Sequence, residues 1–433
     1  MKFGGTSVGG AAAIRQVVEV VRGQLPLRPV VVVSAHAGVT DALQAVARTA
    51  AAEEAAIDAI IERHQQILVG LQLDERLLDA ELADLRDLAR GVRLLGEASA
   101  KITDAVLSFG ERLSARVVAA ALTAKGIEAT AVDAFAAGMV TDSSFGRARP
   151  VPDDGRMLRY LDEVTGVPVV TGFLGADQDG NITTLGRNGS DYSAALIGVA
   201  IAATEIQIWK DVDGVHTADP RLVPDARPIP TMGFEDIANL ASFGSKVLHP
   251  AAMVPAMQHG IRIRVRNTLS PEAPGTTIEA TVDDALPAVR AIAHRTSVAL
   301  VSVRSHRLLP QHAFLARIFA ELHEMECDVG PVAVGEAAVT IAIDDANVGR
   351  IAASLASLGD VQIASERAVV GVIGDAAVLE NGGIADVLKE MVGADISVRC
   401  AGLGALGSTV SVAVAAERLT ETVRLLHSRF FPG

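Results

Sequence analysis

The first ten residues, MKFGGTSVGG, combine a lysine with closely spaced glycines and two hydroxyl side chains. Each glycine costs about 1 kcal/mol in a helix relative to alanine, so this stretch is not expected to be helical. Glycines let backbone N–H groups approach a phosphate closely, and Lys2 can place a positive charge beside it. The segment from Gly4 to Ser7 therefore predicts either a phosphate-binding turn or a purely structural one.

Three further segments carry polar groups that could bind a small charged molecule. The stretch 183–196, TTLGRNGSDYSAAL, is rich in donors and then opens an apolar helix, whose N-terminus attracts an anion. In it, Arg187 can clamp a carboxylate through two parallel hydrogen bonds, and Asp191 can orient a lysine or bind an ammonium group. Ser34 follows a valine run, and Glu111 of SFGERLSA is predicted at a glycine turn before an apolar helix, where helix capping is its alternative role. Phosphate, carboxylate and ammonium groups together indicate a kinase that acts on an amino acid.

The elements that must position these residues alternate between strand and helix. Strands are predicted at 30–33, 128–133, 167–175, 205–209 and 261–265. Helices are predicted at 11–23, 41–108, 190–203, 234–242 and 250–260. This alternation predicts an α/β domain with a mainly parallel sheet, in which ligands bind at the carboxyl ends of the strands.

The composition changes within 267–278, where prolines, a glycine and polar residues replace the apolar pattern. We therefore divide the chain into residues 1–280 and 281–433. The second part contains two weakly similar repeats, at about 296–365 and 366–433, that can exchange strands. Each repeat reads as strand, helix, strand, strand and closing helix, a pattern typical of ligand-binding or dimerisation modules.

Composition limits the classes of partner. The chain has 433 residues, half of them hydrophobic, and a net charge of −14, which argues against nucleic acid or an anionic membrane as a partner. Two cysteines, Cys327 and Cys400, fit a reducing compartment. No apolar run reaches the roughly 18 residues that a membrane-spanning helix needs, and no signal peptide is visible, so we expect a cytoplasmic protein.

One motif points to a different chemistry. GLGALG at 402–407 matches the dinucleotide fingerprint letter by letter, and a dehydrogenase would use it. That fingerprint requires a helix after the glycines, but an alternating apolar run, STVSVAVA, follows here. We therefore interpret the segment as a glycine-rich hairpin. No P-loop motif is present, which argues against a P-loop kinase.

The sequence resembles the aspartate kinases, which belong to the amino-acid kinase family and carry C-terminal ACT repeats. The order of six segments carries the resemblance: KFGGTSV, VVVSAHAGVTDAL, SFGERLSA, TLGRNGSDYSAAL, KDVDGVHTADPR and FGSKVLHPAA. It implies the amino-acid kinase fold followed by two ferredoxin-like repeats. It also implies ATP-dependent phosphorylation of the β-carboxylate of L-aspartate, the first step toward lysine, threonine and methionine. ATP would bring Mg²⁺, held mainly through phosphates and water. Lysine or threonine would act as effector, and the ACT repeats would form a homodimer or higher oligomer.

The resemblance also assigns roles residue by residue. Lys2 would contact the transferred phosphoryl group, Asp191 would position that lysine, and no side-chain metal site is implied. Glu111 would receive the α-ammonium group of the substrate and Arg187 its α-carboxylate. The substrate pocket as a whole would be lined by Ser34, Thr40, Glu111, Thr184 and Arg187. Nucleotide would contact Lys2, Gly4, Gly5, Ser7, Lys210, Asp211, His216, Asp219, Arg221 and Lys246. The effector would contact Leu308, Phe314, Leu315, Asp328 and Val329. His249 is expected in the core.

The sequence departs from the family at several places. Met1 stands directly before Lys2, where the family has a hydrophobic strand. We therefore expect residues before Met1 to be lost and ladder groups at the site to lack partners. The C-terminal end fits either a stand-alone enzyme or the kinase half of a longer fusion protein. Asn188 replaces a common glycine and tolerates positive φ. Gly330 stands where lysine-sensitive members often carry aspartate, which leaves the effector open.

Two other functions remain open from the sequence. One is a different amino-acid kinase, acting on glutamate or N-acetylglutamate. The other is a non-catalytic amino-acid sensor that keeps the repeats beside a degenerate kinase. Glu111 together with the two repeats favours aspartate, and the full set of charged site residues argues against the sensor.

Overall fold

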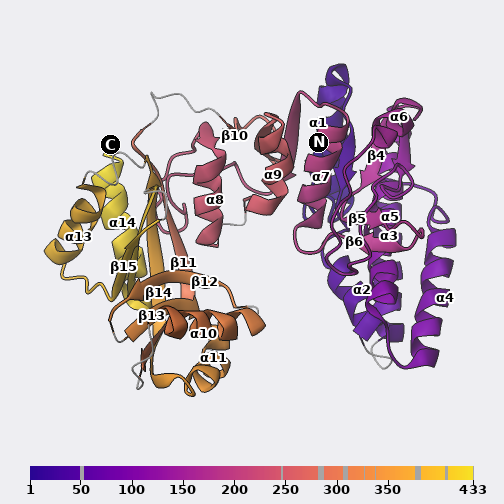
Figure 1. Cartoon of the computed structure of the whole chain (residues 1–433). Helices are drawn as coiled ribbons and strands as arrows, with labels where there is room; N and C mark the ends of the chain where they lie inside the picture. The colour runs from indigo at the N-terminus through magenta and orange to yellow at the C-terminus, as the bar shows by residue number, and fades with distance from the viewer. Residues whose placement is uncertain are drawn as a thin grey trace. The chain divides into compact units, whose positions relative to one another are not determined.

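The computed structural model describes residues 1–48, 53–244, 247–280, 287–305, 311–325, 327–336, 338–375, 382–404 and 408–432. Contacts divide the chain into two compact units (Figure 1). Unit 1 comprises Met1–Val215 and Val247–Ala280, and unit 2 comprises His216–Lys246 and Thr281–Gly433. The second segment of unit 1 ends at residue 280, where the sequence analysis divides the chain. Unit 2 also includes residues 216–246, which the sequence analysis assigned to the first domain.

Unit 1 is built on a mainly parallel sheet, as expected. Within it the strands follow the order β3-β4-β2-β1-β7-β9-β10, and all neighbours are parallel except β9 and β10. Their bounds are β1 (Lys2–Phe3), β2 (Val31–Val33), β3 (Ala129–Val132), β4 (Val167–Thr171), β7 (Glu205–Lys210), β9 (Arg262–Asn267) and β10 (Thr276–Glu279). A separate antiparallel pair is formed by β5 (Leu174–Ala176) and β6 (Ile182–Thr184). Every residue of β2 and β4 is buried, which explains their continuous apolar runs.

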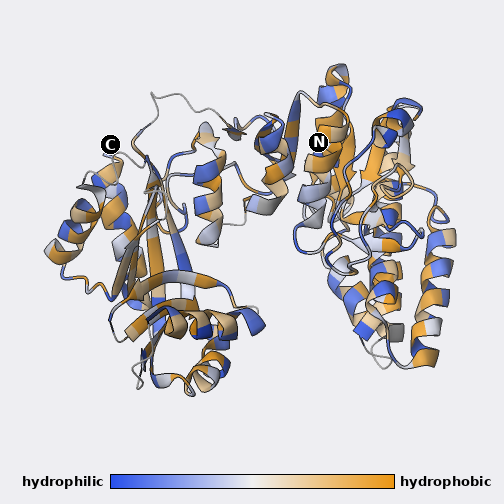
Figure 2. Cartoon of the chain, viewed as in Figure 1, coloured by the Kyte–Doolittle hydropathy of each residue, from blue (hydrophilic) through white to orange (hydrophobic). Residues whose placement is uncertain are grey.

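The helices of unit 1 pack their apolar faces on this sheet and on one another. Their bounds are α1 (Ala11–Gln24), α2 (Val39–Arg48), α3 (Glu53–Leu71), α4 (Asp79–Leu95), α5 (Ala100–Ala124), α6 (Arg156–Asp162), α7 (Gly189–Ala200) and α9 (Pro250–Gln258). Exposed helices such as α4 combine hydrophobic and hydrophilic residues, whereas the strands of the sheet are mostly hydrophobic (Figure 2). Across the described residues, no helix is both long and apolar enough to cross a membrane.

Helix α5 corrects two predictions. The region 41–108 is not one helical stretch, because it divides into α2, α3, α4 and the first part of α5. The predicted glycine turn at SFGERLSA is wrong, because Gly110 lies inside α5. A Cβ on Gly110 would lie 2.7 Å from the Cβ of Ala35, so the glycine allows close packing of the helix against the loop after β2.

One other prediction fails for a local reason. The single strand predicted at 167–175 is interrupted, because Phe173 has a φ of 66° between β4 and β5. The stretch 267–278, where the composition changes, contains the start of β10, which pairs antiparallel with β9. Gly275, with a φ of 68°, directly precedes β10, and a Cβ there would collide with the carbonyl oxygen of Val265.

Unit 2 contains a sheet of six antiparallel strands in the order β12-β13-β11-β14-β16-β15. These strands are β11 (Val289–Ser305), β12 (Val329–Val334), β13 (Ala338–Asp344), β14 (Gly359–Gly374), β15 (Cys400–Leu403) and β16 (Thr409–Ala415). The other elements are β8 (Thr231–Gly233) and the helices α8 (Phe234–Ser242), α10 (Gln311–Glu324), α11 (Val348–Leu355), α13 (Ile384–Gly393) and α14 (Leu419–Phe430).

The two long strands of unit 2 serve both repeats. β11 pairs with β14 from Val289 to Ser305, and its residues 298–304 also pair with β13 on the other side. Residues 367–373 of β14 pair in turn with β16. Each repeat has its own hydrophobic core, and β11 contributes Val301 to the first core and Ile292 to the second. The hairpin interpretation of 402–407 is confirmed by the antiparallel pairing of β15 with β16; residues 405–407 lie outside the described part.

Candidate active site

Three charged side chains from three elements meet in unit 1. The ammonium nitrogen of Lys2, in β1, lies 2.5 Å from Oδ1 of Asp191, in the first turn of α7. The ammonium nitrogen of Lys210, at the end of β7, lies 3.2 Å from Oδ2 of the same carboxylate. Burial raises the pKa of Asp191, but the two lysines outweigh it and hold that pKa below its usual value. The cluster is left with one excess positive charge, which suits an anionic phosphate.

Strand β1 holds Lys2 although it has only two residues. Lys2 pairs with Val32 of β2 on one side and with Ile208 of β7 on the other. The ring of Phe3 stacks on that of Trp209, with 5.9 Å between ring centroids. The N–H of Gly4 donates to the carbonyl oxygen of Trp209 (3.2 Å) and the N–H of Ser34 to that of Phe3 (3.2 Å). The ladder groups at this end of the strand therefore have partners, contrary to expectation.

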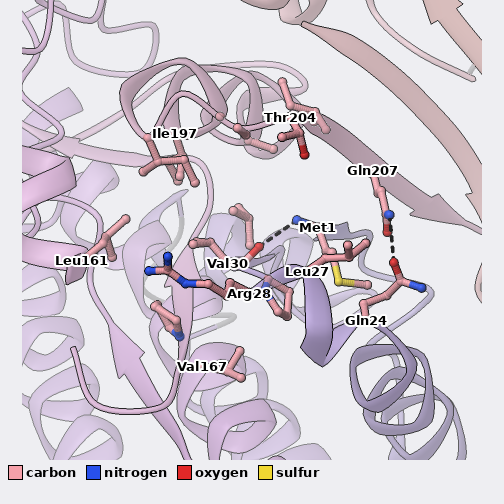
Figure 3. Close-up of a pocket in the computed structure, with 18 of the residues that line it drawn as sticks. Met1, Gln24, Leu27, Arg28, Val30, Leu161, Val167, Ile197, Thr204 and Gln207 are labelled. Atoms are coloured by element: carbon pink, nitrogen blue, oxygen red, sulfur yellow. Dashed lines mark hydrogen bonds between the residues drawn. The ribbon is translucent and has the colours of Figure 1, made fainter. Parts of the chain in front are cut away.

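A pocket of about 680 Å³ lies at the opposite, N-terminal end of these strands (Figure 3). Met1, Val30 and Gln207 line it, and the α-amino group of Met1 donates to the carbonyl oxygen of Val30 at 2.7 Å. Burial lowers the pKa of that amino group to about 5, so it is uncharged at neutral pH. Lys2 and Asp191 are not among the lining residues, so this pocket is separate from the charged cluster.

The glycine-rich segment after β1 is fixed to its surroundings by its own polar groups. The hydroxyl of Ser7 donates to the carbonyl oxygen of Trp209 (3.2 Å) and lies 2.7 Å from the hydroxyl of Thr268. Ser7 is 3% exposed, so its side chain holds the loop to the protein. A Cβ on Gly5 would lie 3.0 Å from the carbonyl oxygen of Ala35, which explains why this position suits glycine.

Glu111 lies on α5 beside the loop that follows β2. Its Oε1 accepts a hydrogen bond from the N–H of Ala35 (3.1 Å) and another from the hydroxyl of Ser190 (3.5 Å). Its Oε2 is buried and has no hydrogen-bond partner among the residues that the structure describes. Burial raises the pKa of Glu111 to about 7. A buried carboxylate oxygen without a donor is a suitable acceptor for an incoming ammonium group.

The raised pKa of Glu111 makes substrate capture pH-dependent. Below pH 7 the carboxyl group is mostly protonated and cannot pair with an ammonium group, so kcat/KM for the amino-acid substrate should rise as the pH approaches 7 and then level off. Glu111→Gln should remove this rise and lower kcat/KM above pH 7. Steady-state kinetics between pH 5.5 and about pH 8.5 measure both profiles. An identical rise in the variant would assign the titration to another group.

The same pKa predicts an effect on stability with the opposite dependence on pH. The folded protein keeps a proton on Glu111 up to about pH 7, whereas the unfolded chain loses it near the ordinary value of 4.5. The contribution of this group to the free energy of unfolding is therefore complete below pH 4.5 and is lost as the pH rises through 7. Chemical denaturation of the wild type and of Glu111→Gln should show that difference.

Asp104 is a buried acid that the sequence analysis missed. It precedes Glu111 by two helical turns on α5, and its carboxylate accepts from the N–H of Gly146 (2.8 Å) and from the N–H (2.9 Å) and hydroxyl (2.8 Å) of Thr184. The hydroxyl proton of Thr184 is thus committed to Asp104, although its oxygen can still accept a bond. The signal available in the sequence was the seven-residue spacing, which places both acids on one helical face.

The start of α7 brings further groups to the site. Asn188 has a φ of 59° at the N-cap position, as its tolerance of positive φ predicts. A Cβ on Gly172 would lie 2.7 Å from the Cβ of Ser190, and the N–H of Phe173 donates to the hydroxyl of Ser193 (2.8 Å). Sequence reasoning also missed Ser190, whose hydroxyl donates to Glu111, because it does not belong to a charge pattern. Arg187 is exposed in the turn before α7.

The remaining predicted residues divide between the two units. Ser34 follows β2 and is partly exposed, while Thr40 is exposed in the first turn of α2 and Asp211 is exposed after β7. His216, Asp219 and Arg221 belong to unit 2, where the guanidinium of Arg221 lies 2.7 Å from the carboxylate of Asp219. The structure therefore groups these three with unit 2 and not with the lysine cluster of unit 1.

Several other predicted positions are placed in the core, on the surface or outside the described residues. Phe314 is 4% exposed in the core of the first repeat, and Leu315 packs against that core. Asp328 and Val329 are exposed at the start of β12. The prediction of a core position for His249 is wrong, because it is exposed just before α9. Two predicted residues lie outside the described part of the chain, Lys246 and Leu308.

Comparison with known proteins agrees with this fold. A sequence model of the amino acid kinase family matches residues 1–267. The lysine-sensitive aspartokinase 3 of Escherichia coli (strain K12) is 31% identical over 99% of this chain and 98% of its own length. Aspartokinase 1, chloroplastic, of Arabidopsis thaliana is 32% identical over 100% of this chain and 80% of its own length. The crystal structure of E. coli aspartokinase III with lysine and aspartate has a TM-score of 0.87, with 30% identity, 99% of this chain covered and 98% of that chain.

The match over more than half of the chain, together with the parallel sheet and the paired lysines, defines the class of protein. This chain belongs to the amino acid kinase family. Within that family it is an aspartokinase, because the relatives that match it along nearly its whole length are aspartokinases.

Proposed function

We propose that this aspartokinase transfers the terminal phosphoryl group of ATP to the β-carboxylate of aspartate at the cluster of Lys2, Asp191 and Lys210. The main support is the geometry of that cluster, in which the buried ammonium group of Lys2 and the partly buried one of Lys210 share one carboxylate. A second support is a similar solved structure, the crystal structure of E. coli aspartokinase III in complex with aspartate and ADP. It matches 99% of this chain with a TM-score of 0.80 and 30% identity.

The chemistry requires charge stabilisation and positioning. The nucleophile is a carboxylate, which is already ionised at neutral pH, so no strong base is needed. Two anions must approach each other and react, so cationic groups at the transferred phosphoryl supply much of the catalysis. In this proposal Lys2 and Lys210 contact the phosphates, and Asp191 keeps their ammonium groups at fixed positions.

Magnesium is proposed to enter with ATP. When bound, it neutralises charge on the phosphates. Asp191 is paired with two lysines, and no group of three or more His, Cys, Asp or Glu side chains in the described part of the chain is arranged to hold a metal. The phosphates and water are therefore proposed to supply most ligands of the ion.

The amino-acid substrate is proposed to lie between Glu111 and Arg187. Its α-ammonium group would bind Oε2 of Glu111, which the described structure leaves without a hydrogen-bond partner. Its α-carboxylate would bind the exposed guanidinium of Arg187. The hydroxyl groups of Ser34, Thr40 and Thr184 would complete this pocket.

The nucleotide is proposed to contact residues from several segments, with the glycine-rich loop around its phosphates. Support comes from the position of that loop, directly after Lys2 and bonded to the end of β7. Within unit 1 the proposed set is Gly4, Gly5, Ser7, Lys210 and Asp211.

A trapping assay tests the substrate. An acyl phosphate reacts with hydroxylamine, so incubation with MgATP, hydroxylamine and one amino acid should give hydroxamate with aspartate. Glutamate and N-acetylglutamate should give none, and product from either would contradict the assignment. Absence of product with every amino acid, from a folded protein, would favour a sensor. Repeating the aspartate reaction with added lysine or threonine tests feedback inhibition.

Regulation and assembly are proposed to involve unit 2. We propose that the effector binds at the first repeat, around Phe314, Asp328 and Val329, and the match to a lysine-sensitive relative supports an amino-acid effector. Exposed apolar side chains on the same repeat, Phe319 at 41% and Val334 at 49%, support a homodimer formed through it. The free thiols of Cys327 and Cys400 support a reducing, cytoplasmic setting.

A further inference from the structure

Three consecutive residues after β2 connect the two halves of the proposed site. The N–H of Ala35 donates to Oε1 of Glu111 (3.1 Å), on the amino-acid side. The imidazole Nδ1 of His36 lies 2.6 Å from the carbonyl oxygen of Val8, and the N–H of Ala37 donates to the carbonyl oxygen of Gly5 (3.1 Å), both on the phosphate side. Among these three bonds, that of His36 is the one to which a side chain of the segment 35–37 contributes, so a substitution within this segment can remove it.

The state of the His36 ring follows from its partner. A carbonyl oxygen can only accept, so Nδ1 must carry the proton and donate it to Val8. His36 is 1% exposed, and burial lowers its pKa to about 3, with further lowering from His64 and Arg63. The ring is therefore a neutral donor of fixed tautomer throughout the physiological pH range.

Helix α3 supports the same loop from a second direction. The guanidinium of Arg63 donates to the carbonyl oxygen of Gly9 (3.0 Å). The ring of His64 lies 5.1 Å from that of His36, centroid to centroid, and its own Nδ1 bonds to Ile60 one turn earlier in α3. His64 therefore packs against His36 and makes its own hydrogen bond within α3.

We propose that His36 is a positioning residue for phosphoryl transfer, which fixes the glycine-rich loop from Gly4 to Gly10 relative to the Glu111 side of the site. The inference rests on the proposed phosphate-binding role of that loop. The imidazole is the side-chain donor that joins the loop after β2 to the carbonyl of Val8. If the imidazole is removed, the buried carbonyl oxygen of Val8 loses this hydrogen-bond donor. The glycine-rich loop is then held less firmly at the place where the phosphates must lie.

Two amide substitutions at the same position separate the hydrogen bond from the loss of the ring. His36→Asn places an N–H₂ donor close to the position of Nδ1, whereas His36→Gln places it one bond further out, near that of Nε2. The Gln variant should lose about tenfold in kcat/KM for ATP, as expected for one buried hydrogen bond, and the Asn variant should stay within about threefold of wild type. KM for aspartate should change less than twofold in both.

A matched control removes the ring of His64, which packs against that of His36. His64→Asn should lower the melting temperature and leave KM for ATP unchanged, because the bond of His64 lies within α3. Equal losses in His36→Asn and His36→Gln, or no loss in either, would overturn the proposal. Nitrogen-15 spectra of the histidines give a further test that uses the wild-type protein and therefore does not depend on the folding of a variant. His36 should be the Nδ1–H tautomer, and the Nε2–H tautomer would contradict the proposal.

The outcomes also separate this inference from the proposed function. If Lys2→Met abolishes turnover while His36→Gln does not change it, the role of His36 is wrong and the proposed function stands. If Lys2→Met keeps full turnover, the proposed function itself fails.

Discussion

Lys2→Met should reduce kcat by about 100-fold or more, the largest effect expected from a single substitution in this chain. Lys2 is nearly buried, and its ammonium group lies 2.5 Å from Asp191, so it is held before any ligand arrives. Preorganised charge of this kind is worth most in the transition state, where negative charge accumulates on the transferred group. Methionine keeps a similar length and volume, so the packing around β1 should survive. Initial rates with saturating aspartate and ATP measure the change.

Binding and folding controls complete that experiment. Calorimetry should show that nucleotide still binds Lys2→Met, because Lys210 remains beside Asp191. Lys101→Met alters an exposed lysine on α5 and should leave kcat unchanged. Wild-type turnover in Lys2→Met would remove this lysine from the mechanism.

Arg187→Ala should raise KM for aspartate about 100-fold and leave KM for ATP nearly unchanged. A guanidinium can hold a carboxylate through two charge-assisted hydrogen bonds, and solvent screening at this exposed residue limits their joint contribution to about 2.7 kcal/mol, which corresponds to about 100-fold. Its exposure before α7 leaves the group accessible to a substrate. Arg187→Lys should recover only part of the affinity, because an ammonium group keeps the charge but lacks the planar pair of donors. Steady-state kinetics with each substrate varied in turn give both constants.

The matched control for Arg187 is a surface arginine of the same unit. The guanidinium of Arg159, on α6, lies 3.8 Å from Asp154, and both side chains are exposed. Arg159→Ala should leave both KM values unchanged. If Arg187→Ala also left KM for aspartate unchanged, the α-carboxylate of the substrate would have to bind elsewhere.

The fold of unit 1 was largely predictable, because it rests on local periodicity. Valine runs such as β2 and β4 are buried on both faces, and α1 buries Ile14, Val17 and Val21 at helical spacing. Segments whose conformation depends on a neighbour were predicted less well. Gly110 reads as a turn in isolation, yet it lies within α5 because Ala35 packs against it. The strand β10 lies partly in a proline-rich stretch and exists because β9 pairs with it.

The sequence by itself determined the residue types and the order of six motifs, and from these it predicted a lysine, an aspartate, a glutamate and an arginine for phosphate, ammonium and carboxylate groups. Tertiary structure alone decided which of them meet. Lys2 and Asp191 lie far apart in the chain. The sequence around each of them does not indicate that Lys210 shares the carboxylate of Asp191. Asp104 and His36 likewise look ordinary in sequence, because their importance depends on Thr184 and Val8, which only folding brings near. Local periodicity determines elements, whereas electrostatic and hydrogen-bond partners depend on distances that the folded sheet sets.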